Sequence, residues 1–211
     1  MKPNHIAITL SALCAALSMV PAQAADAATR GLPIRGGDIS SLKKGEDHGA
    51  VYLDASGRRR DAIKILKSSG MNYARLRVWV NPADGYNNKA RVLEMARRIK
   101  ANGMKLLIDF HYSDSWADPG KQNKPAAWAS LDLAGLEQAV YDHTFDVLSG
   151  LKAQGTTADM VQIGNEINGG MLWPDGHIDN WDNLAALLTS GAHAVKDVSK
   201  STRVMLHRAE G

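Results

Sequence analysis

Strand-like and helix-like segments alternate along the chain from about residue 36 onward, and this order restricts the fold more than any other feature. In the segment 73–80, apolar and polar side chains alternate strictly, which is typical of a β-strand. After Asn88, a residue suited to begin a helix, apolar residues recur at helical spacing as far as Gly103. The predicted strands cover residues 36–42, 73–80, 105–112, 160–167 and 203–207, and the predicted helices cover 61–69, 181–199 and the stretches from Asn88 to Gly103 and from Asp132 to Gly155.

Regular alternation of strands and helices predicts a parallel sheet, either an open doubly wound sheet or a (β/α)8 barrel. A doubly wound nucleotide-binding sheet needs a glycine-rich phosphate turn after its first strand, and this chain has only Gly36-Gly37 within that strand. The polar residues lie instead at the ends of successive strands, which converge on one face of a barrel. We therefore expect an α/β fold of the barrel type, with the nucleotide-binding sheet as the alternative. The residues at the predicted strand ends are Arg77, Trp79, Asp109, His111, Asn165, Glu166 and His207.

The first 24 residues have the pattern of a secretory signal peptide. Lys2 precedes an apolar run over residues 6–20, and Ala22-Gln23-Ala24 is a small-x-small cleavage site. An uncleaved membrane anchor is the alternative, although the run is short for a membrane span. We expect a signal peptide over residues 1–24, a spacer over 25–31 and a folded domain over 32–211, exported to the periplasm or the cell exterior and not held at a membrane after cleavage.

The charge of the chain argues against a nucleic-acid partner. The formal net charge is +3, and the two signs are interspersed apart from Arg58-Arg59-Arg60, a cluster that suits a solvated loop. The single cysteine, Cys14, lies in the predicted signal peptide, so the mature chain would depend on its core and not on disulfides. Apolar residues make up 45% of the sequence, which is sufficient for such a core.

The pair Asn165-Glu166 carries the clearest chemical signal, at the end of the fourth predicted strand. A glutamate in a concave polar site can act as a general acid, and the adjacent asparagine can bind a sugar hydroxyl beside the reacting carbon. An ordinary strand-ending turn explains the same pair without any chemistry. Tryptophans in nearby loops favour the chemical interpretation, because pyranose rings stack on aromatic faces. Trp181, at the start of a helix, is expected to pack in the core instead.

Four longer stretches resemble glycoside hydrolase family 53, the endo-β-1,4-galactanases of clan A. They are residues 36–40 (GGDIS), 75–79 (RLRVW), 109–119 (DFHYSDSWADP) and 162–168 (QIGNEIN). The resemblance extends from about Leu32 to Gly211 and implies a (β/α)8 TIM barrel. It also implies a secreted enzyme that cleaves internal β-1,4-galactosidic bonds of galactan and type I arabinogalactan with retention. Another clan A β-glycanase, such as a mannanase or cellulase, and a non-catalytic carbohydrate-binding protein are the alternatives.

The resemblance also implies roles for individual residues. Glu166 would be the acid/base, Asn165 would hold the sugar 2-hydroxyl, and Arg77 would orient the nucleophilic carboxylate. Asp109 is expected to be a buried partner of Arg75 or Arg77 and not a catalyst. No cofactor or metal is expected in this chain, and any calcium loop of the family would belong to later strands. The residues expected to bind the polysaccharide substrate are His111, Trp116, Asp118, Trp128, Trp173 and His207.

Retaining hydrolysis needs two carboxylates about 5–5.5 Å apart, one acid/base and one nucleophile. In the family the nucleophile is a glutamate at the end of strand seven, whereas this sequence ends in its fifth predicted strand. Its last acidic residue, Glu210, lies beyond His207 and does not match the missing group. We therefore expect a barrel truncated after strand five, which is inactive on galactan by itself.

Overall fold

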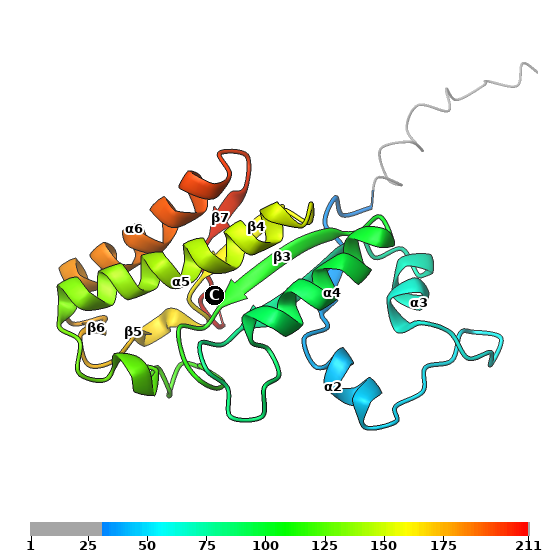
Figure 1. Cartoon of the computed structure of the whole chain (residues 1–211), viewed down its shortest axis with the longest axis horizontal. Helices are drawn as coiled ribbons and strands as arrows, with labels where there is room; N and C mark the ends of the chain where they lie inside the picture. The colour runs from blue at the N-terminus through cyan, green and yellow to red at the C-terminus, as the bar shows by residue number, and fades with distance from the viewer. Residues whose placement is uncertain (1–30, 211) are drawn as a thin grey trace, which may run out of the picture. The chain divides into compact units, whose positions relative to one another are not determined.

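The computed structural model describes residues 31–210, and the segment Ile34–Gly211 forms one compact unit. Within this unit strands and helices alternate (Figure 1). The strands of the main sheet are β1 (Gly36–Asp38), β2 (Tyr73–Val78), β3 (Lys105–Phe110), β4 (Met160–Ile163) and β7 (Arg203–Met205). The α-helices are α2 (Leu42–Asp47), α3 (Ala62–Ser68), α4 (Lys89–Ala101), α5 (Leu133–Ala153) and α6 (Trp181–Val198).

Shorter elements complete the unit, and they lie in the loops that follow β3 and β4. They are the 3-10 helices η1 (Ala126–Trp128) and η2 (Ile167–Gly169) and the antiparallel hairpin of β5 (Gly170–Met171) and β6 (Gly176–His177). The predicted signal peptide and all but the last residue of the predicted spacer lie outside the described residues.

The five strands pair in the order β1-β2-β3-β4-β7, and every pair is parallel. Each strand therefore lies beside the strand that precedes it in this sheet, and the order never reverses. A doubly wound sheet contains such a reversal, at the point where its ligand binds. The observed order is that of consecutive units of a (β/α)8 barrel, so the predicted barrel class is confirmed and the nucleotide-binding sheet is excluded.

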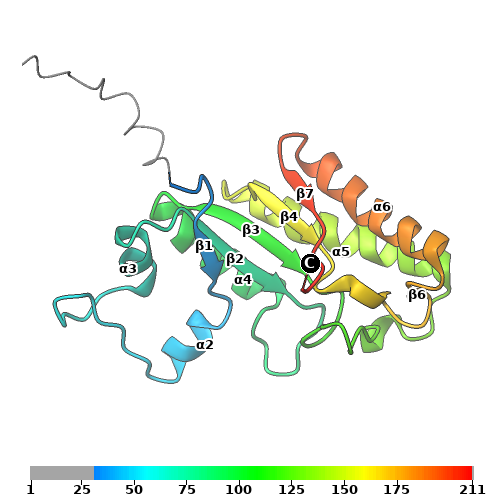
Figure 2. The same cartoon turned by 180° about the vertical axis from the view of Figure 1, so that it is seen from behind.

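Helices α4, α5 and α6 cover one face of the sheet, as the opposite views in Figures 1 and 2 show. The hydrophobic core lies between this face and the helices, and alternate strand residues such as Leu76, Ile108 and Ile163 are almost fully buried in it. Burial of each such side chain stabilises the fold by about 1.5–3 kcal/mol. In Figure 2 the opposite face of the sheet lies toward the viewer, and this face forms the interior of a closed barrel.

Three helices begin where the sequence predicts, because a polar side chain precedes each of them. The side chains of Asp61, Asn88 and Asp132 accept hydrogen bonds from backbone N–H groups in the first turns of α3, α4 and α5. Those N–H groups have no carbonyl partner within the helix, and a capping side chain of this kind contributes about 1 kcal/mol.

The strands end earlier than the sequence predicts. β3 ends at Phe110 and β4 at Ile163, whereas the predicted strands continue to residues 112 and 167. The backbone enters the left-handed region at Tyr112 (φ 50°), Gly164 (φ 78°) and Glu166 (φ 51°), which is incompatible with an extended strand. Polar residues expected at these strand ends therefore lie in the loops just beyond them.

Further differences concern a helix, a hairpin and one tryptophan. The segment 36–42, predicted as a strand that ends in a turn, is a strand only to Asp38; the turn follows, and the helix α2, which begins at Leu42, was not predicted. The hairpin of β5 and β6 has two residues in each strand, too few to produce a periodic pattern. Trp181 is 62% exposed, so the expectation that it packs in the core is wrong; Leu184 and Leu187 form the buried face of α6.

Candidate active site

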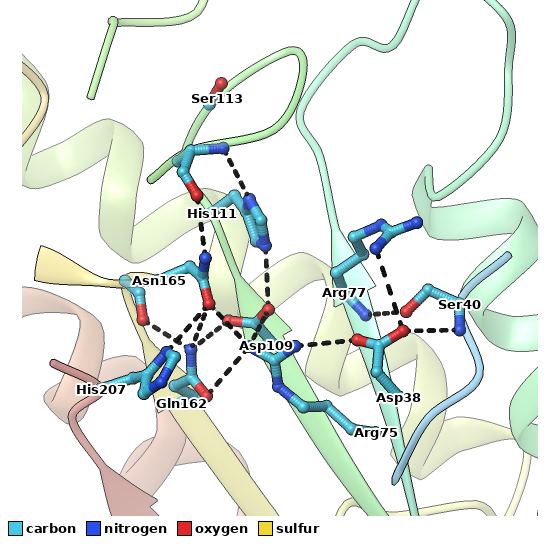
Figure 3. A network of polar contacts seen from close by, with 12 residues as sticks. Asp38, Ser40, Arg75, Arg77, Asp109, His111, Ser113, Gln162, Asn165 and His207 are labelled. Carbon is cyan, nitrogen blue, oxygen red and sulfur yellow. Dashed lines mark hydrogen bonds and ion pairs between the residues drawn. The ribbon is translucent and has the colours of Figure 1, made fainter. Parts of the chain in front are cut away.

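Polar side chains from neighbouring strands converge at the carboxyl end of the sheet (Figure 3). Asp38 pairs in register with Arg75, and Asp109 pairs with Arg77 on one side and with Gln162 on the other. Side chains at paired positions point to the same face of a sheet. They therefore meet in the mouth of the barrel, where the loops beyond the strands add His111, Asn165, Glu166 and His207.

Arg75 lies at the centre of this cluster. Its Nη1 donates to Asp38 Oδ2 at 2.8 Å, and its Nη2 donates to Asn165 Oδ1 at 2.7 Å and lies 2.7 Å from Asp109 Oδ2. Gln162 Nε2 donates to the second oxygen of Asp109 at 2.5 Å. Asp109 is fully buried, and a buried carboxylate is tolerated only when charge pairing and hydrogen bonds replace water. The prediction that Asp109 is a buried partner of an arginine is confirmed.

His111 is buried, and its two hydrogen bonds define its tautomer. The backbone N–H of Ala117 donates to Nδ1 at 3.0 Å, so Nδ1 is the acceptor. Nε2 then carries the proton and donates to Asp109 Oδ2 at 2.9 Å. The Trp116 ring stands edge-on to the imidazole, with 5.4 Å between the ring centroids. His111 thus lies at the site, and both of its nitrogens are engaged within the protein.

The side chain of Asn165 is fixed on both sides. Its Oδ1 accepts hydrogen bonds from Arg75 and from His207 Nδ1, the latter at 3.1 Å, and its Nδ2 donates to Ala117 O at 2.8 Å. These partners define which end of the amide is oxygen and which is nitrogen. The second Nδ2 hydrogen has no partner within residues 31–210, so it can donate to a hydroxyl of a ligand.

Glu166 follows directly and is half-buried. Its backbone is left-handed (φ 51°, ψ 48°), a conformation that costs a non-glycine residue about 1–3 kcal/mol and persists only where the surroundings impose it. Within the described part of the chain, its carboxylate forms no hydrogen bond or ion pair. The carboxylate is therefore available for contact with a ligand.

Arg77 lies on the same side of β2 as Arg75 and shares Asp38 with it, its Nη1 lying 3.9 Å from Asp38 Oδ1. Its Nη2 donates to Ser41 Oγ at 2.7 Å, and its guanidinium carbon lies 4.7 Å from the centroid of the Trp116 ring. Burial lowers the pKa of the Arg77 guanidinium, while the charge of Asp38 opposes this shift. An arginine remains protonated at neutral pH despite such a shift. Arg75, and not Arg77, donates the hydrogen bond to Asn165.

The tryptophans predicted to stack on sugar lie in different environments. Trp116 is 40% exposed beside His111 and presents a ring to the site. Trp128 is 8% exposed and packs against Tyr112 and His143 in the core, so its placement gives no support to a stacking role. Trp173 is half-buried between β5 and β6, and its indole N–H donates to Gly169 O at 2.8 Å.

Asp118 lies in the loop after β3 and stabilises that loop. Its Oδ1 accepts a hydrogen bond from the Gly120 N–H at 2.9 Å, and its backbone pairs with Lys121. The prediction that Asp118 binds substrate stays a prediction.

Sequence patterns predict Arg75 only as a possible partner of Asp109, and they do not predict Gln162 or Gln122 as site residues. Arg75 lies on the same side of its strand as Arg77, and Gln162 is a lone polar residue in the apolar stretch 160–163, so both carry a usable signal. Gln122 lies in an irregular loop without any periodic pattern, and only the fold brings it to Asn165 and Glu166.

Among residues 31–210, no set of three or more His, Cys, Asp or Glu side chains is arranged to hold a metal ion. In the same part of the chain, no helix combines the length and the apolar character that a membrane span requires.

A sheet of consecutive parallel βα units, with polar side chains gathered just beyond the carboxyl ends of its strands, defines the class of (β/α)8-barrel folds. The family model for glycosyl hydrolase family 53 matches residues 34–211. The chain is 44% identical over 186 residues to a probable arabinogalactan endo-beta-1,4-galactanase A of Aspergillus terreus. It is 41% identical over 196 residues to an arabinogalactan endo-beta-1,4-galactanase A of Emericella nidulans. These matches cover 87% and 92% of this chain, and 53% and 56% of the relatives.

Solved structures agree with the sequence comparison. The GH53 catalytic domain of Ignisphaera aggregans matches 85% of this chain with a TM-score of 0.80 and 44% identity, and 53% of that chain is covered. One of two fungal beta-1,4-galactanases matches 84% of this chain with a TM-score of 0.82 and 42% identity, and 54% of that chain is covered. The chain belongs to glycosyl hydrolase family 53, and it spans about half the length of each of these relatives.

Proposed function

We propose that this chain supplies the acid/base side of a retaining glycoside hydrolase that cleaves internal β-1,4-galactosidic bonds of galactan and type I arabinogalactan. The observation that carries the proposal is the unpaired Glu166 carboxylate beside the rigidly held Asn165 amide, at the carboxyl end of β4. The names of the relatives from Aspergillus terreus and Emericella nidulans support galactan as the substrate.

In this mechanism Glu166 first protonates the glycosidic oxygen, so that the leaving sugar departs as a neutral alcohol. A nucleophilic carboxylate forms the glycosyl-enzyme intermediate on the opposite face of the sugar ring. Glu166, now deprotonated, then removes a proton from the water that hydrolyses the intermediate. The free Nδ2 hydrogen of Asn165 donates to the sugar 2-hydroxyl during these steps.

The nucleophile in this proposal comes from outside residues 31–210. Asp38 and Asp109 are the other carboxylates at the site, and both are paired with the Arg75 guanidinium. The oxygens of the fully buried Asp109 are engaged by Arg75, His111 and Gln162. Those of Asp38 are engaged by Arg75 and by the backbone N–H of Ser40, so neither carboxylate is free to attack a sugar. We therefore propose that residues 31–210 alone do not hydrolyse galactan.

We also propose that the protein is exported, since residues 1–24 have the pattern of a signal peptide. Export suits a polysaccharide substrate, because such polymers lie outside the cell. Detection of a secreted or periplasmic chain that begins at Ala25 tests this part of the proposal.

The main experiment joins residues 31–211 to the second half of the Aspergillus terreus relative and measures reducing sugar released from β-1,4-galactan. Glu166→Gln is expected to lower the rate by about 10²- to 10⁴-fold, the usual contribution of a general acid. Glu137→Gln, in the half-buried position on α5, is the matched control and is expected to retain the parent rate. Full activity of the Glu166→Gln variant contradicts the acid/base assignment.

Two other outcomes identify the alternatives. Faster release from mannan or cellulose than from galactan by the joined protein indicates another β-glycanase of clan A. Retardation of the unmodified chain in a galactan gel, together with an inactive joined protein, indicates a carbohydrate-binding protein without catalysis.

A further inference from the structure

Gln122 lies in the loop after β3 and is 1% exposed. Its side-chain Nε2 donates to the backbone carbonyl oxygens of Asn165 at 2.8 Å and Asp118 at 3.0 Å, and Glu166 O lies 3.3 Å away as a further acceptor. One amide nitrogen thus connects the loop after β3 with both residues of the Asn165–Glu166 pair.

Glu166 depends on its backbone for its orientation. Its carboxylate has no partner within residues 31–210, so no side-chain contact there aims it. Its left-handed φ of 51° is unfavourable for a residue with a Cβ, and the surroundings must therefore hold it. The bond from Gln122 to Glu166 O acts on this backbone directly.

Gln122 is itself held in place from the other side. Its backbone oxygen accepts a hydrogen bond from the backbone N–H of Trp173 at 2.7 Å. The next residue, Asn123, forms a β-bridge with Trp173. Lys124 Nζ lies 2.6 Å from Asp175 Oδ2 in the same region. The loop after β3 is therefore held against the segment between β5 and β6, and these contacts fix the position of the Gln122 side chain.

We propose that Gln122 is a positioning residue that holds the Asn165–Glu166 backbone in its left-handed turn and thereby aims the Glu166 carboxylate at the substrate. The proposal rests on the role proposed above for Glu166. The position requires a hydrogen-bond donor, because all three neighbouring groups are carbonyl acceptors. An ionised carboxylate here would place negative charge against those carbonyls.

The first test is made by NMR on the whole chain, without any sugar. The one-bond Cα–Hα coupling of Glu166 reports the sign of φ. We expect the positive-φ value in the parent and in the control Gln138→Met, which changes an exposed glutamine on α5. In Gln122→Met, which has a similar shape but no donor, the coupling is expected to shift toward the negative-φ value. A folded Gln122→Met chain with the parental Glu166 coupling overturns the proposal.

A second variant separates positioning from a general loss of packing. In Gln122→Glu, the protonated carboxyl at low pH keeps an O–H donor, and the ionised carboxylate at high pH has none. The parental Glu166 coupling is therefore expected to return as the pH is lowered through the titration of that carboxyl. A Glu166 coupling that does not change with pH in this variant contradicts the proposal.

A measurement on the parent covers the case in which neither variant folds. Buried, hydrogen-bonded side-chain amide protons exchange slowly with solvent, so the Gln122 NH₂ protons are expected to be protected. The Gln138 amide is exposed on α5 and bonded only to the neighbouring Asp142, so its protons are expected to exchange fast. Exchange of the Gln122 protons at the rate of Gln138 overturns the proposal.

Activity of the joined protein separates this proposal from the proposed function. Gln122→Met is expected to lower kcat about 10- to 100-fold with little change in KM, as for a misaligned catalytic group. If Glu166→Gln leaves hydrolysis unchanged, the proposed function fails, while the NMR result still decides whether Gln122 holds the turn. If Glu166→Gln is inactive and Gln122→Met retains kcat, the aiming role of Gln122 fails alone.

Discussion

Arg75 Nη2 donates to Asn165 Oδ1 at 2.7 Å across a sequence separation of 90 residues, and the same nitrogen lies 2.7 Å from Asp109 Oδ2. One guanidinium therefore neutralises the buried carboxylate of the site and fixes the amide beside the proposed acid/base. Removal of this side chain affects stability and site geometry together.

Arg75→Met is expected to lower the free energy of unfolding by about 3–5 kcal/mol, because Asp109 is left as a buried charge without its partner. Urea unfolding followed by circular dichroism measures the change. Arg58→Met is the control, since it removes an exposed arginine paired with Asp54 and is expected to cost much less. Equal losses in the two variants contradict the central role of Arg75.

Gly164→Ala is expected to destabilise the turn that leads to Glu166. The added Cβ would lie 2.5 Å from Ile167 Cγ2, in addition to the strain of placing alanine at φ +78°. Gly57→Ala is a matched control, because Gly57 has a similar φ of +74° and open space around it. Thermal unfolding is expected to show a loss of about 1 kcal/mol for Gly57→Ala and a clearly larger loss for Gly164→Ala. The steric argument fails if the two melting temperatures agree.

The stability of the chain is expected to decrease in mild acid because of His143. Burial lowers the pKa of His143 to about 4, with Asp146 opposing the shift and Lys89 adding to it. Within residues 31–210 its Nε2 has no hydrogen-bond partner, and the ring packs against Phe110, Tyr112 and Trp128. Between pH 6.5 and 4 the unfolded chain binds a proton that the folded chain does not bind, so the free energy of unfolding falls as the pH falls.

From pH 7.5 to pH 5 this histidine alone accounts for a loss of about 2 kcal/mol. Urea unfolding at the two pH values measures it. His143→Phe fills the same aromatic surroundings without a titrating group and is expected to reduce the loss by that amount. His193→Gln, at an exposed position of α6, is expected to keep the parental pH dependence. An unchanged pH dependence in His143→Phe refutes the assignment.

Trp116→Ala is expected to weaken binding of β-1,4-galacto-oligosaccharides about tenfold, which corresponds to about 1.4 kcal/mol. The ring is exposed at the site and lies over the Arg77 guanidinium, which holds it in position. Isothermal titration calorimetry measures the affinity. Trp181→Ala removes a more exposed tryptophan outside the cluster and is expected to leave the affinity unchanged. Equal effects of both substitutions indicate nonspecific adsorption of sugar on exposed aromatic rings.

The order of strands and helices was predictable because hydrophobic periodicity depends on local sequence alone. The same periodicity placed Arg75, Arg77 and Asp109 on one face, and their pairing follows from the parallel register. Periodicity could not decide which arginine reaches Asn165. That choice depends on how far each side chain lies from the carboxyl ends of the strands, and Arg75 precedes Arg77 by two residues along β2.

The loops were beyond the reach of sequence patterns for a different reason. The left-handed turn at Glu166 and the hydrogen bonds that the Gln122 amide donates to it depend on contacts between segments more than 40 residues apart. Trp128 and Trp116 share a loop and a residue type, yet one is in the core and the other is at the site. Residue type alone cannot separate these environments, because burial is a property of the folded chain.

The strictly sequential strand order has a consequence for the synthesis of the protein. Each strand pairs with its predecessor in the sheet, so the sheet can grow by one βα unit at a time as the polypeptide leaves the ribosome. Arg75, Asp109 and Asn165 are all present once the segment beyond β4 has emerged. The polar cluster of Arg75, Asp109 and Asn165 can therefore assemble before β7 is made, and His207, just beyond β7, then joins a template that is already ordered.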